Sequence, residues 1–311
     1  MRRSMSDFVP NGVLCIDKPA EFTSFDVIAK LRGITHTRKI GHAGTLDPMA
    51  TGLLPVFFGT ATKACDILPI QDKRYLAGFQ LGMTSDTEDI WGSCTKTGVP
   101  VPDRETVESA LEHFRGEIMQ VPPMYSALSV GGKRLYDLAR QGITVERQPR
   151  PVTIYRLELT GYDPETGSGT LDVCCSKGTY IRTLCADLGQ KLGTGGVMSS
   201  LRRTEAAGFT LDDAVSLETV AEWMQNDGLK GRLLSEERLF SPYPAIRLNP
   251  VQTRMFLNGV RMDLNRIPDA AKADPSTPWR IFGADGRFLG LGQAFTEAKE
   301  LRLLKFFVER N

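Results

Sequence analysis

The sequence predicts an α+β fold: a mixed, mainly antiparallel sheet with helices, a basic inserted segment and a small β-rich domain at the C-terminus. Helical segments interleave with short apolar strands, yet several strand pairs have only short links, which favours antiparallel pairing over a doubly wound sheet. After Leu234 the chain becomes polar, passes SPYPAI and LNP, and ends in alternating runs such as RFLGLGQAF and LRLLKFFVE. We therefore expect a large domain at about 10–240 and a small domain at 245–311.

The first elements are predicted from one apolar run and one capped segment. Residues 12–19, GVLCIDKP, indicate a short buried strand that ends at Lys-Pro. Thr23-Ser24 then supplies a cap for a helix, FDVIAKLRGI. Helical spacing is met by the apolar positions Phe25, Ile28, Ala29 and Leu31, which we expect to face the core.

The remaining elements of the large domain follow from the same patterns. LLPVFFG at 53–59 fits a buried strand or a short helix. Strands are predicted at 73–83, 157–159 and 169–175, and helices at 104–115, 180–192 and 217–224. Residues 121–150 are rich in Pro, Gly and basic side chains around a helical piece, RLYDLARQG, which indicates a mobile basic insertion with its own helix.

Composition limits the class of protein. The chain has 311 residues, of which 41% are hydrophobic and 24% charged, as in ordinary globular proteins. Residues 1–10, MRRSMSDFVP, lack the apolar region of a secretory signal, and no apolar run approaches the ~20 residues of a membrane span. We expect a cytoplasmic protein without a membrane partner. Six cysteines without a C-x-x-C pair and three histidines without i, i+4 spacing do not predict a zinc site.

Net charge is +1, but the charges are segregated along the chain. Four basic residues and His36 lie between Lys30 and Lys39 without an acid, whereas acids dominate from Asp86 to Glu108. Such segregation permits a basic face that binds nucleic acid, although solvated loops explain the charges equally well.

The stretch GHAGTLDPMATG at 41–52 places a carboxylate between glycines and a proline. Asp47-Pro48 fits a helix N-terminus, with Asp47 as N-cap and proline at the first helical position. Gly41 and Gly44 permit a sharp bend or close approach of another group, which a cap does not require. The absence of a following Gly-Lys-Ser/Thr excludes a P-loop. His42 is either a structural residue or, with Arg38-Lys39, part of a phosphate contact.

Two further residues invite a functional interpretation. Tyr75 opens a strand, where it is either a core residue or a stacking platform. Arg182 falls in the first turn of a predicted helix, where the macrodipole disfavours a cation. An anionic partner such as Asp47 would explain its position.

Taken together, these stretches resemble one family. GHAGTLDPMATGLLPV is followed in order by GTATK, KRYLAGFQLGMTSDTEDIWG, PPMYSALSVGGKRLYDLARQG, RPVTIY, SKGTYIRTL and LRRT. The series is similar to that of the TruB-type tRNA pseudouridine synthases, which isomerise uridine 55 in the T-loop of tRNA. The resemblance covers about residues 10–210 and continues loosely to the C-terminus. It implies the pseudouridine synthase fold.

The resemblance assigns roles to individual residues. It implies that Asp47 is the catalytic residue and that Arg182 pairs with it. Substrate-binding residues implied in the same way are Tyr75, which stacks on the target base, Tyr180, Arg182, Leu201 of the apolar wall, His42 and Lys18. The basic insertion at about 122–149 matches the thumb that closes over the RNA, with Lys133, Arg134 and Arg140 as candidates for backbone contacts. The C-terminal segment resembles the family's PUA-like domain.

The implied chemistry fits these residue types. The N1–C1′ bond of uridine breaks, the uracil turns and C5 joins C1′, so nothing enters or leaves and one carboxylate suffices where glycosidases use two. The resemblance implies tRNA as the partner and no cofactor or metal, and we expect a monomer that needs no guide RNA. The target base must be flipped out of the folded loop.

Three alternatives remain at this point. The chain could be an RNA-binding protein that helps tRNA to fold, with catalysis dispensable or accompanying. It could resemble the guide-RNA-dependent synthases of archaea and eukaryotes, against which the thumb and the absence of a long basic tail argue. A metal-dependent hydrolase built on His36, His42 and Asp47 is the third.

Overall fold

The computed structural model describes residues 10–226 and 228–308. Residues 1–9, from which we expect no secretory signal, lie outside the described residues. So do residues 309–311 of the predicted C-terminal domain. Within the described part, a ten-stranded sheet has the main order β14 (Ala214–Val215), β1 (Gly12–Lys18), β3 (Thr51–Phe58), β12 (Gly196–Ala206), β4 (Lys73–Leu81), β11 (Ser168–Cys175), β10 (Arg150–Asp163) and β7 (Gly116–Gln120). β2 (Ile40–His42) pairs with β3, and β13 (Phe209–Thr210) with β12.

Most of these pairings are antiparallel, and within the described part of this sheet only β1–β14 and β3–β12 are parallel. The predicted mixed, mainly antiparallel sheet is therefore confirmed. The strand at 53–59 is also confirmed, because Leu53–Phe58 pairs with β1 over its whole length. The helix alternative for this run is wrong.

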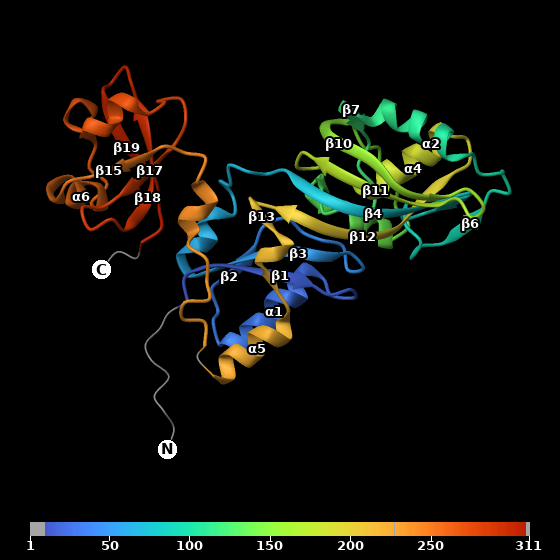
Figure 1. Cartoon of the computed structure of the whole chain (residues 1–311), viewed down its shortest axis with the longest axis horizontal. Coiled ribbons are helices and arrows are strands. Elements are labelled where there is room, and N and C mark those ends of the chain that lie inside the picture. Colours follow the sequence, from blue (N-terminus) through green and yellow to red (C-terminus); the bar gives the residue numbers. More distant parts are fainter. Residues whose placement is uncertain (1–9, 227, 309–311) are drawn as a thin grey trace.

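Two pairs of helices bury the two halves of the sheet (Figure 1). α1 (Ser24–Thr35) and α5 (Leu217–Gln225) pack against β1 and β3, where Ile16, Val27 and Val220 belong to one apolar cluster. α2 (Arg104–Leu111) and α4 (Ile181–Lys191) pack against β4, β10 and β11 in a second cluster that includes Phe79 and Leu184. The second half of the sheet supplies one wall of the site described below.

Helix α1 begins where the sequence predicts but faces a different way. Thr23 and Asp26 form a capping box, in which each side chain accepts the other residue's backbone N–H. The buried apolar positions are Val27, Ile28 and Leu31. Phe25, predicted to face the core, is 64% exposed, and Ala29 is exposed as well. That part of the prediction is wrong, because the sheet and α5 leave one face of α1 in solvent.

Asp47-Pro48 forms a turn rather than the predicted helix N-terminus. The N–H of Ala50 donates to the carbonyl of Asp47 at 3.1 Å, and β3 begins immediately afterwards at Thr51. Three residues between Asp47 and the strand leave no room for a helix. The N-cap prediction for Asp47 is therefore wrong, and its carboxylate does not cap a helix.

The halves of the sheet meet at a short parallel seam between β3 and β12. Its register pairs are Arg202 with Thr51 and Arg203 with Gly52. Gly52 has a φ of 96°, and a Cβ there would lie 2.3 Å from the carbonyl oxygen of Arg203. Only glycine allows the strands to approach this closely. The seam brings the turn that carries Asp47 beside strands from the second half of the sheet.

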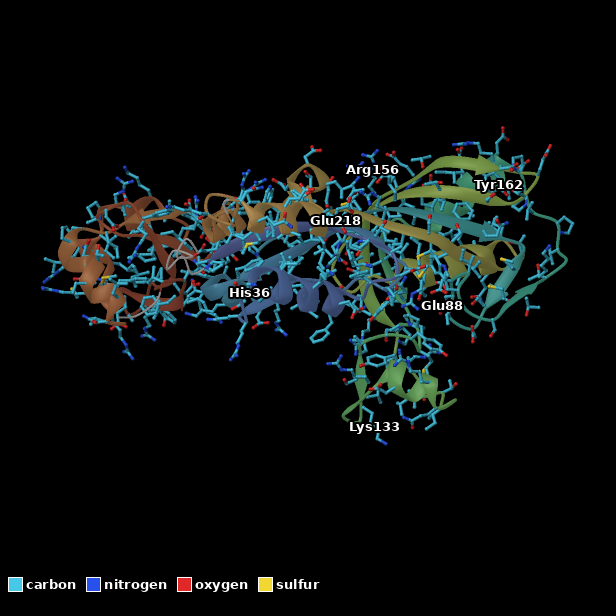
Figure 2. The ribbon with its side chains drawn as sticks, turned by 90° about the horizontal axis from the view of Figure 1, so that it is seen from below. His36, Glu88, Lys133, Arg156, Tyr162 and Glu218 are labelled. Atoms are coloured by element: carbon cyan, nitrogen blue, oxygen red, sulfur yellow. The ribbon has the colours of Figure 1, made fainter. Side chains whose placement is uncertain are left out.

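The basic insertion projects from the body, with Lys133 at its tip (Figure 2). It contains a small hairpin of β8 (Ser129–Val130) and β9 (Lys133–Arg134) followed by α3 (Leu135–Arg140). The predicted helical piece is therefore present. A second hairpin, β5 (Met83–Ser85) with β6 (Cys94–Lys96), extends from the end of β4. Short 3₁₀ helices lie at Gly59–Ala64, Glu112–Phe114, Leu211–Asp213, Glu236–Phe240, Leu264–Arg266 and Pro268–Lys272.

The C-terminal region is β-rich, as predicted. Its five-stranded sheet has the order β15 (Ala245–Arg247), β17 (Trp279–Phe282), β18 (Phe288–Phe295), β19 (Glu300–Phe306) and β16 (Met262–Asp263), with α6 (Pro250–Leu257) beside it. Phe240, Phe288 and Phe307 form an aromatic contact between this sheet and the body. The domain limits at 240 and 245 stay predictions. In the described part of the chain, no helix is long and apolar enough to cross a membrane.

Candidate active site

Asp47 and Arg182 form an ion pair across the junction of the two half-sheets. The Nε atom of Arg182 lies 3.0 Å from one carboxylate oxygen of Asp47, and Nη2 lies 3.4 Å from the other. The side chain of Arg182 is 6% exposed and that of Asp47 is 44% exposed. The guanidinium is thus part of the protein interior, while the carboxylate faces solvent and can be reached by a substrate.

Arg182 is held by several other groups. It donates to the carbonyl oxygens of Tyr125 at 2.8 Å and of Thr87 at 3.2 Å, and the carboxylate of Asp89 lies 4.0 Å away. Gln120 fixes the start of α4, since its side chain both accepts from and donates to the backbone of Tyr180. These contacts offset the unfavourable position of a cation in the first turn of a helix. They leave the guanidinium a single orientation toward Asp47.

Asp89 is a second carboxylate near this pair, but it accepts hydrogen bonds within its own loop. Its side chain is 14% exposed. It accepts from the Thr87 hydroxyl at 2.7 Å and from the backbone N–H of Trp91 at 3.1 Å. Asp89 therefore orders its own loop, and Asp47 is the carboxylate that a substrate can contact.

Lys18 supports the turn that carries Asp47 from inside the protein. Its side chain is fully buried, and Nζ donates to the carbonyl oxygens of Pro19 at 2.8 Å, Phe22 at 2.5 Å and Pro48 at 2.9 Å. Burial lowers the pKa of Lys18 to about 8, although the nearby Asp47 carboxylate acts in the opposite direction. The bond to Pro48 ties β1 to the residue that follows Asp47, so Lys18 acts on the backbone of the turn.

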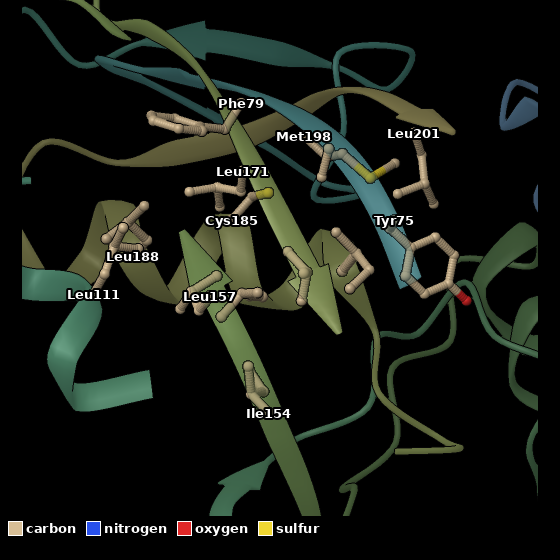
Figure 3. Packing of buried hydrophobic residues seen from close by; sticks show 14 of the residues in the cluster. Tyr75, Phe79, Leu111, Ile154, Leu157, Leu171, Cys185, Leu188, Met198 and Leu201 are labelled. Carbon is tan, nitrogen blue, oxygen red and sulfur yellow. The ribbon is translucent and has the colours of Figure 1, made fainter. Parts of the chain in front are cut away.

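Tyr75 and Leu201 form the apolar side of the site. They are 7% and 8% exposed and lie at the same end of the cluster between the sheet, α2 and α4 (Figure 3). The hydroxyl of Tyr75 points away from this cluster. Burial raises the pKa of Tyr75 to about 12, which keeps the phenol neutral at physiological pH. Tyr75 is therefore fixed by packing, and only a small part of the residue is exposed.

Arg203 belongs to the site, and the sequence interpretation missed it. It is fully buried opposite Tyr75 in the β4–β12 register. Its Nε donates to the Leu53 carbonyl at 2.8 Å and its Nη2 to the Gly44 carbonyl at 2.9 Å. The signal was present in LRRT: residues two apart on a strand share a face, so an inward Leu201 implies an inward Arg203. Arg203 thus anchors the turn at Gly44, whereas Lys18 anchors it at Pro48.

The other predicted residues lie at varying distances from this centre. His42 is half-buried at the end of β2, where burial lowers its pKa and keeps the ring neutral at pH 7. Tyr180 lies two residues before Arg182, at the N-cap position of α4, and burial raises its pKa. Lys133, Arg134 and Arg140 are exposed on the thumb. The structure brings none of these three to Asp47, and two of them, Arg134 and Arg140, lie over the ring of Tyr136.

A metal site was one alternative for this region. Within residues 10–226 and 228–308, no three His, Cys, Asp or Glu side chains are grouped so that they could hold a metal ion. His36, His42 and Asp47 therefore do not make the ligand set that a metal-dependent hydrolase requires. The geometry instead offers one accessible carboxylate, a guanidinium that fixes it and a rigid apolar wall. Such a carboxylate can act as a nucleophile or as a general base on a flat nucleobase.

Comparison with known proteins identifies the family. Residues 32–181 match the model of the TruB family pseudouridylate synthase N-terminal domain. Residues 182–241 match the tRNA pseudouridylate synthase B C-terminal domain, and residues 244–299 match the model described as pseudouridine synthase II TruB, C-terminal. The three matches are consecutive and cover most of the described chain.

Curated relatives are similar to this chain over nearly their full length. A protein named tRNA pseudouridine synthase B from Clostridium tetani is 39% identical over 94% of this chain and 99% of its own. One of the same name from Pseudomonas syringae is 41% identical over 96% and 95%. The solved structure titled Crystal Structure of a Cbf5-Nop10-Gar1 Complex has the same fold, with a TM-score of 0.72 and 24% identity over 96% of this chain and 85% of that chain. The chain therefore belongs to the TruB family of pseudouridylate synthases.

Proposed function

We propose that this protein converts uridine 55 in the T-loop of tRNA to pseudouridine, with Asp47 as the reacting carboxylate. The relatives that match almost end to end are named tRNA pseudouridine synthase B. The observation that carries the assignment of Asp47 is its half-exposed carboxylate, held by the buried Arg182 at 3.0 Å. Among the described residues this carboxylate pairs with Arg182 alone, and an exposed carboxylate fixed beside an apolar wall is suited to chemistry.

The reaction needs one such group. The N1–C1′ bond of uridine breaks, the uracil turns, and C5 forms the new bond to C1′. The proton lost from C5 is balanced by the proton gained at N1, so substrate and product are isomers. Since no water enters, the second carboxylate of a glycosidase has no counterpart here. Asp47 acts as nucleophile or base.

The neighbouring residues are assigned supporting roles. Arg182 orients Asp47 by two contacts to its carboxylate. Tyr75 stacks on the uracil, and Leu201 closes the wall beside it, since stacking holds a base while it rotates. Tyr180 borders the site through its place before Arg182, and His42 at the start of the turn contacts the opened loop. Lys18 fixes the backbone after Asp47 through the carbonyl of Pro48.

Recognition of the RNA must offset the cost of flipping the base, which is a few kcal/mol. We assign phosphate contacts to Lys133, Arg134 and Arg140 on the thumb, because all three are exposed. The C-terminal PUA-like domain contacts the acceptor side of the tRNA. The protein works as a monomer without a guide RNA and, because tRNA is a cytoplasmic molecule, in the cytoplasm.

One experiment tests the assignment. Unmodified tRNA is treated with the purified protein, and pseudouridine is located by mass mapping after carbodiimide labelling. We expect one site, uridine 55, with full-length tRNA and also with an isolated T-stem-loop that has no accessory protein. Modification at another position would refute the site, and no modification in either RNA would refute the activity. Modification that requires an added guide RNA would favour the guide-dependent alternative.

A further inference from the structure

Three cations of the basic run between Lys30 and Lys39, namely Arg32, Arg38 and Lys39, lie on one exposed face that the proposed reaction does not use. Helical spacing puts Phe25, Ala29, Arg32 and His36 on one side of α1, and all four are exposed. Arg38 and Lys39 follow on the exposed connection into β2. We call Phe25, Arg32, His36, Arg38 and Lys39 the α1–β2 face.

In the part of the chain that the structure describes, the cations of this face are not neutralised by acidic side chains, whereas about half of the arginines elsewhere are. Within the described residues, Arg32, Arg38 and Lys39 form no ion pair, and Arg32 makes one long hydrogen bond to the carbonyl of Ile40 at 3.4 Å. Eleven other arginines of the described chain are ion-paired: Arg74, Arg104, Arg115, Arg156, Arg182, Arg202, Arg238, Arg261, Arg266, Arg280 and Arg302. Lys30 lies on the side of α1 toward α5, close enough to act on Glu218, and is not part of the face. The face is thus positive and uncompensated.

Its shape is open. Apart from Arg32, the residues between Phe25 and His36 on this side are small: Ala29 is exposed, and a Cβ at Gly33 would meet no atom within 4 Å. Phe25, at the start of the helix, is the most exposed large apolar side chain in the described chain, at 64%. A shallow cationic surface with one aromatic ring fits a nucleic-acid backbone together with one base or ribose.

The face also lies in a particular place. At one end, the Ser24 hydroxyl exchanges hydrogen bonds with the backbone of Leu46, the residue before Asp47. At the other end, the carbonyl of Lys39 accepts the N–H of Gly59, and the next residue, Thr60, donates to the carbonyl of Phe307 beside the C-terminal sheet. The face therefore runs from the catalytic turn toward the C-terminal domain. Figure 2 shows His36 between that domain and the thumb.

We propose that the α1–β2 face binds the sugar–phosphate backbone of the tRNA between the flipped nucleotide and the part held by the C-terminal domain. This inference rests on the proposed function, which brings a tRNA to Asp47. The 12 residues of α1 span about 18 Å, so the contacts fall on RNA beyond the reacting base. Arg38 and Lys39 bind phosphates, and the ring of Phe25 stacks on a base or ribose next to the loop.

The test compares two double variants of the full-length protein with the same change of charge. Arg38→Gln/Lys39→Gln removes two cations of the face. Lys96→Gln/Lys191→Gln removes two exposed cations that also lack ion pairs in the described chain and lie outside the face. Binding of full-length tRNA is measured between 50 and 200 mM salt. The rate of pseudouridine formation is measured at saturating tRNA.

For the face variant we expect about tenfold weaker binding and a plot of log affinity against log salt that is shallower by about 1.5, because each phosphate contact contributes about 0.7–0.9 to the slope. The control variant should bind as the wild type does, and kcat should stay within about twofold for both, since neither pair touches the reacting nucleotide. Equal losses in the two variants, or an unchanged slope in the face variant, would overturn the proposal.

The result is distinguishable from failure of the proposed function. If the wild type forms no pseudouridine, the reaction assignment fails, and the comparison of salt slopes still decides whether the face binds tRNA. If the wild type is active and its salt slope equals that of the face variant, the reaction assignment stands and the α1–β2 face is excluded as a tRNA-binding surface.

Discussion

The cations that hold the Asp47 turn and those along the α1–β2 face have opposite surroundings. Lys18 and Arg203 are fully buried and donate to three and two backbone carbonyls, respectively. Arg38 and Lys39 are exposed and form no ion pair in the described chain. A buried cation must be satisfied by the protein, whereas an exposed one remains available to a ligand. The first pair therefore fixes geometry, and the second is suited to binding.

The largest expected effect falls on Asp47, whose turn is held by the buried cations while its carboxylate is 44% exposed. Asp47→Asn should lower kcat for pseudouridine formation by at least about a thousandfold, because a neutral amide can act neither as nucleophile nor as base. tRNA affinity should stay within several-fold, since the binding cations are elsewhere. Single-turnover kinetics and filter binding measure the two quantities. Normal turnover would exclude the mechanism. Lost binding would show that the Asp47 turn, and not only the α1–β2 face, contributes to tRNA affinity.

Arg203→Met should give the next largest effect, on stability. It leaves the buried carbonyls of Leu53 and Gly44 without their donor, so we expect the free energy of unfolding to fall by about 2–4 kcal/mol. Arg202→Met is the matched control. Arg202 is the neighbour on β12, and its pair with Asp17 is about 40% exposed on both sides, so its loss should cost at most about 1 kcal/mol. Urea unfolding of both variants tests this, and similar losses would contradict the distinction.

Lys18 predicts a pH dependence that an exposed lysine would not show. Its pKa is about 8 in the folded protein and 10.5 as an ordinary value. Below pH 8 both states hold the proton; between about 8 and 10.5 the folded state releases it while the unfolded state retains it, so rising pH favours folding. The stability of the wild type should therefore rise relative to Lys18→Met across this window. Parallel curves from urea unfolding at pH 7, 9 and 10 would refute the shift.

The smallest effect concerns Phe25, which tests the exposed region alone. Phe25→Ala should leave the free energy of unfolding within about 0.5 kcal/mol, because the ring is 64% exposed. It should weaken tRNA binding several-fold, as expected for one lost stacking contact. Phe25→Tyr keeps the ring and should restore the affinity. Thermal unfolding and tRNA titration measure the two outcomes, and a large loss of stability would assign Phe25 to the fold.

Patterns with short range were predicted well. The strand of β1, the Thr23 cap and the alternating C-terminal strands follow from local spacing, which survives in the folded protein. The ordered motifs also placed Asp47 and Arg182 in one site, and the structure puts them 3.0 Å apart. The elements depend on residues that are neighbours in sequence, and the site was predicted from several motifs that occur in a fixed order.

What could not be predicted depends on partners distant in sequence. Asp47-Pro48 has the local chemistry of a helix N-terminus, but pairing of β3 with β1 and β12 takes the chain into a strand three residues later. Phe25 and Ala29 fit an apolar stripe, yet the position of α5 decides which side of α1 is covered. Arg203 lies in a strand that was not predicted, and its carbonyl partners lie about 150 residues earlier in the chain.

The seam between β3 and β12 has a consequence for how the enzyme matures. Its two residue pairs join segments separated by about 150 residues, and such long-range pairings form late because a large loop must close first. The second half-sheet, with β4, β10, β11, α2 and α4, can acquire its core before the seam exists, whereas the first also needs β14 and α5 from about 200 residues later. Asp47 and Arg182 meet only across the seam. We expect regained activity to lag behind regained circular dichroism during refolding, and coincident traces would contradict this. Catalysis would then report completion of the fold rather than its beginning.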